Sequence, residues 1–227
     1  MSPALLQALR AALDSRQTLL AELHAQGTDC YRLFHGSQEG APGLTVDRYG
    51  PQLLVQSFHQ PLEREALLAL AAAIDEHLGE KLLLVYNDRS QGNSRIDRRD
   101  PVYQAEAAAL EDLVGHEWGL NYRVRGRHSG QDPLLFLDLR NARGWVKDNS
   151  AGKSVLNLFA YTCGIGLCAA AGGAAEVWNL DFAEGNLAVG RENAALNPEL
   201  APMRFDESIC LPDLAWSLVH RHGFPSR

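Results

Sequence analysis

The stretch VLNLFAYTCGIG, residues 155–166, decides the fold of this chain of 227 residues. Its first part, Val155–Ala160, is a continuous apolar run of the kind that forms buried parallel strands. The alanine-rich segment Leu167–Ala171 that follows the turn has the composition of a helix. A strand that stops at a glycine turn and restarts as a helix leaves backbone N–H groups pointing at a ligand. Gly164 and Gly166 carry no side chain that would keep such a ligand from the backbone.

A second strand and an acid follow the turn in the order that a βαβ unit requires. Glu176–Leu180 is a short strand that ends at Asp181, and Ala183–Leu196 is the helix after it. Asp181 lies 17 positions after Gly164, and an acid at this place can accept hydrogen bonds from both hydroxyls of a ribose. This alternation of strands and helices predicts a parallel sheet with right-handed crossovers.

The glycine pattern alone leaves other interpretations open. Gly164–Ala169 also fits GxGxxA, the dinucleotide fingerprint, so NAD is a competing cofactor. A tight strand-to-helix turn that binds no ligand is a further possibility, although the ordered strand, turn, helix, strand and acid argue against it.

The preceding part of the chain has the pattern of a small α+β domain. Leucines recur at helical spacing near the N-terminus, and Gly50-Pro51 lies between two β-rich runs as a turn signal. The expected elements are a helix over 3–26, strands over Leu44–Arg48 and Gln52–Phe58, a helix over Pro61–Leu78 and a strand over Lys81–Asn87.

Residues 88–128 are the most basic part of the chain. This stretch is either a solvated edge of the small domain or a rim that faces RNA, where arginines meet phosphates. Nearby aromatic residues could stack on bases, although single aromatic side chains more often belong to a core. The basic residues are Arg89, Arg95, Arg98, Arg99, Arg123, Arg125, Arg127 and His128, and the aromatic ones are Tyr103, Trp118 and Tyr122.

Composition excludes several classes of protein. Hydrophobic residues make up 46% of the chain, which supports a buried core and argues against global disorder. The formal net charge of −7 argues against strong non-specific nucleic-acid binding by the whole molecule. There is no apolar run long enough to span a membrane and no signal-peptide pattern.

The cysteines point to neither metal nor disulfide chemistry. The four of them are not spaced as CxxC, and no histidine cluster joins them, so we expect no metal site and no disulfide framework. A reduced, cytoplasmic environment fits this usage. They are Cys30, Cys163, Cys168 and Cys210.

Three motifs in order resemble one family. Residues 155–166 resemble motif I of class I S-adenosylmethionine (SAM)-dependent methyltransferases, and most of all the bacterial 23S rRNA cytosine-C5 methyltransferase-like proteins with their "F-[AS]-Y-T-G-G" turn. Residues 136–143 resemble the family's "Y-L-D-Q-R-x-x-R" segment, and residues 40–50 resemble "G-L-P-G-L-T-V-D-R-Y-G" of its small α/β domain. Asn193 and Asn197 match the helix after the ribose acid. The resemblance covers about residues 30–205.

The resemblance implies SAM as cofactor and ribosomal RNA as partner. Asp181 would hold the ribose and Phe182 would lie against the adenine, while Asp138 and Arg140 would contact the methionine end. A structural salt link is the alternative role for this last pair. The implied cofactor-binding residues are Asp138, Arg140, Asn157, Phe159, Ala160, Tyr161, Thr162, Gly164, Gly166, Asp181 and Phe182.

The resemblance stops after Phe205. The family continues with an acid beside the adenine, an Asp-Pro-Pro-type loop at the transferred methyl group and further strands, but residues 206–227 contain no Asp-Pro-Pro. Such a break is typical of a truncated or frameshifted product, so we expect impaired catalysis. No cysteine here matches the family's nucleophile position.

The sequence therefore predicts an α/β fold with an incomplete Rossmann-like methyltransferase sheet behind a small α+β domain. An NAD-dependent oxidoreductase and a non-catalytic module that binds RNA or a partner remain the alternative functions. The expected divisions are an N-terminal helix over 1–29, the small domain over 30–130, the first part of the SAM-binding domain over 131–205 and an aberrant tail over 206–227.

Overall fold

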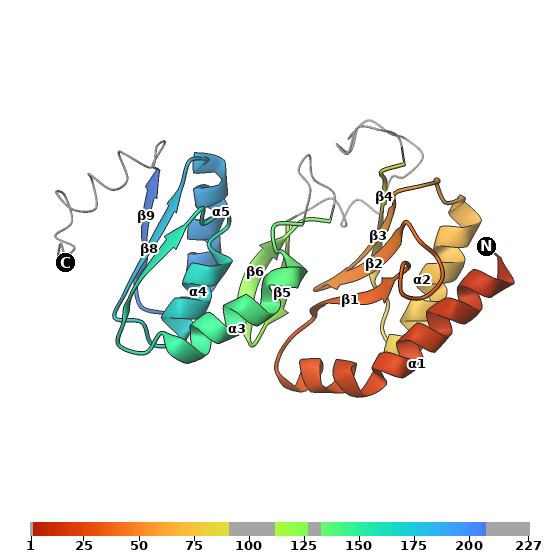
Figure 1. Ribbon diagram of the computed structural model, residues 1–227, viewed down its shortest axis with the longest axis horizontal. Coiled ribbons are helices and arrows are strands. Elements are labelled where there is room, and N and C mark those ends of the chain that lie inside the picture. Colours follow the sequence, from red (N-terminus) through yellow and green to blue (C-terminus); the bar gives the residue numbers. More distant parts are fainter. Residues whose placement is uncertain (1, 91–111, 127–132, 208–227) are drawn as a thin grey trace. The chain divides into compact units, whose positions relative to one another are not determined.

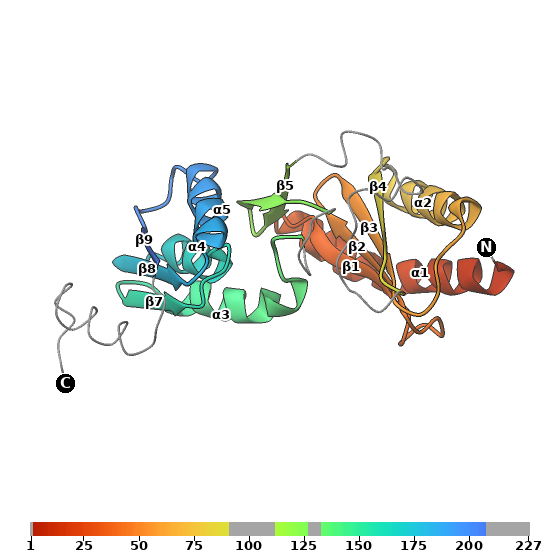
Figure 2. The same ribbon diagram turned by 90° about the horizontal axis from the view of Figure 1, so that it is seen from above.

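The computed structural model describes residues 2–90, 112–126 and 133–207. The chain divides into two compact units, Met1–Leu137 and Asp138–Arg227. Figures 1 and 2 show the helices and strands of each unit. No helix in the described ranges is both long and apolar enough to cross a membrane.

The first unit contains a four-stranded sheet with two helices and a separate hairpin. The strands β1 and β2 are antiparallel, as are β2 and β3, whereas β3 and β4 run parallel on either side of α2 in the sequence. The elements are α1 (Pro3–Ala25), β1 (Cys30–His35), β2 (Leu44–Tyr49), β3 (Gln52–Ser57), α2 (Arg64–Leu78), β4 (Leu83–Asp88) and the hairpin β5 (Leu113–Glu117) and β6 (Leu120–Val124).

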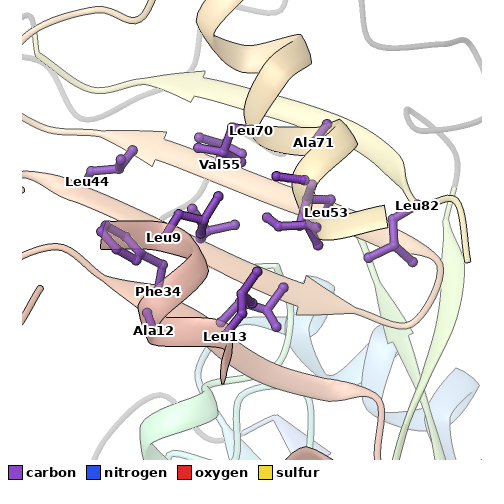
Figure 3. Close-up of a cluster of buried hydrophobic side chains, with 14 of the residues drawn as sticks. Leu9, Ala12, Leu13, Phe34, Leu44, Leu53, Val55, Leu70, Ala71 and Leu82 are labelled. Carbon is purple, nitrogen blue, oxygen red and sulfur yellow. The ribbon is translucent and has the colours of Figure 1, made fainter. Parts of the chain in front are cut away.

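Both helices contribute to one hydrophobic core against this sheet. Figure 3 shows Leu9 and Leu13 of α1 and Leu70 of α2 packed beside Phe34 and Leu53 of the strands. Side chains alternate between the two faces of a strand, so Leu53 and Val55 of β3 belong to this core, whereas the buried Leu54 between them does not. The helix α1 is therefore part of the first unit, and its leucine spacing reflects burial in this core.

The motif over residues 40–50 builds part of the sheet and supplies two buried charges. Arg32 donates to both carboxylate oxygens of Asp47, at 2.7 and 3.1 Å, and Arg48 donates to Glu80 at 2.6 Å. Burial raises the pKa of Asp47 above its ordinary value, although the bonds from Arg32 act in the opposite direction. These residues of the motif have a structural role in this unit.

The second unit contains a three-stranded parallel sheet in the order β7-β8-β9. In Figure 1 the helices α4 and α5 lie on the same side of this sheet, and the apolar side of α4 packs on β7 and β8. The elements are the 3-10 turn η3 (Leu137–Leu139), α3 (Arg140–Asn149), β7 (Ser154–Leu158), α4 (Gly164–Ala171), β8 (Glu176–Asp181), α5 (Glu184–Ala195) and β9 (Arg204–Glu207).

The expected strand-turn-helix order is confirmed in this unit, with one extension. Asp206 and Glu207, which we assigned to the tail, pair with Leu180 and Asp181 as part of β9. The strand therefore reaches two residues further than the resemblance indicated. Three parallel strands with helices between them form a Rossmann-like α/β arrangement.

Candidate functional site

The candidate site lies at the carboxyl ends of β7 and β8, where ligands bind in open parallel sheets. Leu158 and Leu180 are partners in the strand register, so the loops that follow them start side by side. The N–H of Ala160 donates to the carbonyl of Leu180 at 2.9 Å. This bond ties the first loop, residues 159–163, to the end of β8.

Asp181 joins the two loops through both of its carboxylate oxygens. Its Oδ2 accepts the N–H of Tyr161 at 2.8 Å, and its Oδ1 accepts the N–H of Ala183 at 2.9 Å and the Asn186 amide at 3.5 Å. The residue is only 5% exposed. An ionised carboxylate offers about four acceptor positions. These three bonds leave about one for a ligand hydroxyl, and a second hydroxyl would replace the 3.5 Å bond from Asn186.

The loop over residues 159–163 has a strained backbone. Phe159, Tyr161 and Cys163 have φ values of 54°, 50° and 63°. A left-handed conformation costs a residue with a side chain roughly 1–2 kcal/mol, and such strain persists only where surrounding contacts impose it. It is concentrated at functional sites, which agrees with the place of this loop.

Two aromatic side chains stand out at the same end of the sheet. Phe159 follows β7 and is 69% exposed, and Phe182 follows β8 and is 64% exposed. Side chains with this exposure contribute little to the stability of the fold, because most of their apolar surface remains in water. Phe182 directly follows Asp181, and Phe159 follows the strand that pairs with β8. Both provide flat apolar surface, which suits a purine base.

Gly166 and Asn157 lie beneath the loop in a buried polar cluster. Asn157 donates to Asn179 Oδ1 at 2.9 Å across β7 and β8, and Asn179 is fully buried. A Cβ on Gly166 would lie 2.1 Å from the same oxygen. The sequence suggested that Gly166 opens the backbone to a ligand, whereas the structure gives its missing side chain a packing reason.

The remaining expected residues fall into two groups. Ala160 and Thr162 are buried in the loop, and Gly164 begins α4 directly after it. Asp138 is exposed and Arg140 is half-buried at the junction of η3 and α3. The helix α3 packs against α4, the helix that starts at the loop.

The sequence analysis did not predict the contacts that three polar residues make in this site. No sequence pattern marked Asn179 or Asn186, because their partners are set by strand register and by the first turn of α5. A sequence pattern did mark Asn193, since it matches the family's helix after the ribose acid. Its amide donates to the carbonyl of Thr162 at 3.0 Å.

The described cysteines have no features of a nucleophile. Cys30, Cys163 and Cys168 are buried. Burial, with a smaller contribution from Asp181, raises the pKa of Cys163 to about 12, and burial raises the pKa of Cys30 as well. A nucleophilic cysteine needs the thiolate and access to its substrate, so within the described ranges none is suited to attack a base.

The expected RNA-facing rim is described only in part. Arg125 pairs with Asp112, and the Arg89 guanidinium lies 5.0 Å from the ring centre of Phe58. Tyr122 is fully buried, so of the two roles left open for these aromatic residues it has the core one and cannot stack on a base. Arg95, Arg98, Arg99, Tyr103, Arg127 and His128 lie outside the described residues.

Comparison with known sequences identifies the family. Residues 31–205 match the family described as S-adenosylmethionine-dependent methyltransferase. The chain is 37% identical over 198 residues to a ribosomal RNA large subunit methyltransferase of Deinococcus radiodurans, covering 85% of this chain and 48% of that protein. It is 31% identical over 211 residues to ribosomal RNA large subunit methyltransferase I of Aeromonas hydrophila, covering 83% and 47%.

Solved structures agree on the fold. A SAM-dependent methyltransferase from Streptococcus mutans matches with a TM-score of 0.74 at 24% identity, over 95% of this chain and 55% of that one. A methyltransferase complexed with S-adenosylhomocysteine (SAH) matches with a TM-score of 0.75 at 24% identity, over 95% and 54%. The chain spans about half the length of the curated relatives it matches. The matches give no support to an NAD-dependent oxidoreductase, and the chain belongs to the S-adenosylmethionine-dependent methyltransferase family.

Proposed function

We propose that this chain binds SAM between the loop over residues 159–163 and the loop after β8. Asp181 carries the proposal, because it is a nearly buried carboxylate with acceptor capacity left at the carboxyl end of β8. Its oxygens would accept the ribose hydroxyls, and Phe182 would cover the adenine. Backbone N–H groups at the start of α4, around Gly164, would face the cofactor. Asp138 and Arg140 would bind its methionine end.

We further propose that the protein to which this chain corresponds methylates large-subunit ribosomal RNA, with cytosine C5 as the target. The two relatives named above support the RNA substrate, and the resemblance of the loop motif supports the base. C5 of cytosine becomes nucleophilic when a thiolate adds to C6. The methyl group of SAM would then pass to C5, which leaves SAH. Loss of the C5 proton would expel the thiolate from C6.

The buried cysteines limit how that chemistry can be assigned. Cys163 lies in the loop beside Asp181 with a pKa of about 12, so it remains a neutral thiol at physiological pH. We therefore assign the attacking thiolate to a part of the protein outside the described residues. The described second unit would hold the cofactor and orient its ribose.

Calorimetric titration with SAH tests the cofactor site, with NADH as the control ligand. We expect SAH to bind with 1:1 stoichiometry and NADH to give no heat. Asp181→Ala should abolish SAH binding, because it removes the ribose acceptor and the bond to Tyr161 N–H. A folded chain that binds NADH in place of SAH would contradict the proposal.

Methylation of RNA needs a separate measurement. Large-subunit ribosomal RNA would be incubated with methyl-labelled SAM and the protein to which this chain corresponds. The RNA would then be digested to nucleosides and analysed by mass spectrometry. 5-Methylcytidine is the expected product. A different methylated nucleoside would keep the SAM-dependent activity and refute cytosine C5 as the target.

A further inference from the structure

The loop over residues 159–163 needs contacts that impose its left-handed residues. Bonds from β8 and Asp181 fix Ala160 and Tyr161, as described above. Thr162 and Cys163 come next, and Cys163 keeps a φ of 63° although it is not glycine. Two contributions hold this second half of the loop. The Cys163 N–H donates to the Ala160 carbonyl at 2.8 Å, and further contacts come from α5, a helix that begins more than twenty residues later in the sequence.

One face of α5 is turned to the loop. Asn193 is fully buried, and its Nδ2 donates to the Thr162 carbonyl at 3.0 Å. One turn earlier, a Cβ on Gly190 would lie 2.4 Å from Cys163 Sγ, so the cysteine side chain occupies the space that this glycine leaves. At the start of the helix, the Asn186 amide lies 3.5 Å from Asp181 Oδ1.

The bond from Asn193 acts on the second peptide group after the one that meets Asp181. Tyr161 supplies the N–H that Asp181 accepts, and Thr162 follows it directly. Fixing the Thr162 carbonyl therefore limits rotation of the backbone on the carboxyl side of Tyr161. The Cys163 thiol adds a weak bond to the Tyr161 carbonyl at 3.7 Å.

We infer that Asn193 is a positioning residue for the cofactor: it holds the strained loop in the shape that presents backbone groups and Asp181 to SAM. This inference rests on the proposed cofactor site. It adds α5 to that site, as the element that fixes the loop without touching the ligand.

Asn193→Leu tests the inference, with Asn197→Leu as the matched control. Leucine has the same number of side-chain heavy atoms as asparagine and the same branch at Cγ, but it cannot donate to Thr162. Asn197 is also buried, two residues after the last residue of α5, but its amide donates at 2.7 Å to the Asn193 carbonyl at the end of that helix. Each variant loses a buried amide hydrogen bond, which reaches Thr162 in the loop from Asn193 and reaches the Asn193 carbonyl from Asn197.

We expect Asn193→Leu to weaken SAH binding at least tenfold, and Asn197→Leu to change it less than threefold, at a temperature where both remain folded. Amide hydrogen exchange without ligand should speed up at Tyr161 and Cys163 in the first variant only. Equal losses of affinity in the two variants, or unchanged exchange in the loop, would overturn the inference. Failure of the unmodified chain to bind SAH would refute the proposed function, whereas the exchange measurement would still decide the role of Asn193.

A second-site variant tests whether the loss of affinity in Asn193→Leu comes from the backbone of the loop. Glycine at position 163 adopts a φ of 63° without strain, so the loop then depends less on its bond from α5. Cys163→Gly added to Asn193→Leu should recover several-fold of the lost affinity. A double variant no better than Asn193→Leu in affinity and in loop exchange would refute the positioning role.

Discussion

Gly166 is the residue on which the packing beneath the loop depends most directly. A Cβ at this position would lie 2.1 Å from Asn179 Oδ1, inside a cluster that also holds Asn157. We expect Gly166→Ala to lower the free energy of unfolding by about 1–3 kcal/mol, the usual effect of overpacking a core. Thermal unfolding followed by circular dichroism would measure it.

Gly185 in the same unit provides the control for that substitution. It lies in the first turn of α5, where an added Cβ would meet nothing within 4 Å. Gly185→Ala should leave the melting temperature unchanged or raise it slightly, because alanine favours a helix. A similar loss of stability at both positions would show that the contact with Asn179 does not decide the effect.

At the scale of elements, the buried Asp47 of strand β2 makes the stability of the first unit depend on pH. Burial raises the pKa of Asp47 in the folded chain above its unfolded value of about 3.9. The folded state therefore holds this proton more tightly. The contribution of Asp47 to stability is fully present below about pH 4 and is lost as the pH rises through the folded pKa.

The comparison with Asp47→Asn isolates this group from the other carboxyl groups. The variant cannot titrate at position 47, so the unmodified chain should lose stability relative to it as the pH is raised from about 4 to 7. Urea unfolding at several pH values gives the difference in the free energy of unfolding. A difference that is constant with pH, or one that grows in favour of the unmodified chain, would contradict the raised pKa.

Elements of the second unit could be predicted because their signals are local. The apolar run of β7, the glycines that follow and Asp181 at the end of β8 lie in one short stretch. The strand β1 (Cys30–His35) was missed, since it is short and a register shift between Arg32 and Phe34 interrupts the alternation of apolar and polar residues. The hairpin β5–β6 was missed because it lies within the basic stretch over residues 88–128, which was interpreted as a whole, although the hairpin itself contains one arginine.

Contacts of the site could be predicted only where the chain itself brings residues together. Asp181 and Tyr161 follow neighbouring strands, so the βαβ order was enough to place them at one edge. The bond from Asn193 to Thr162 joins residues 31 positions apart, and it depends on how α5 packs on the loop. The packing reason for Gly166 likewise depends on strand register, which sets Asn157 opposite Asn179.

For the whole molecule, the division into two units predicts how the cofactor affects stability. The first unit has its own core, formed by α1, α2 and the four-stranded sheet, and the proposed cofactor residues all belong to the second unit. A ligand stabilises the state that binds it, by about 2.7 kcal/mol when its concentration is a hundred times Kd. SAH should therefore stabilise the second unit selectively.

Differential scanning calorimetry with and without SAH would measure this selectivity. We expect two transitions, of which SAH raises only one, and hydrogen exchange would assign that one to the unit that contains β7 and β8. Asp181→Ala should remove the shift and leave the transition of the first unit in place, because the first unit's core contains none of the residues that Asp181 contacts. A single transition that SAH raises as a whole would mean that the two units unfold together, and then stability could not report on the cofactor site alone.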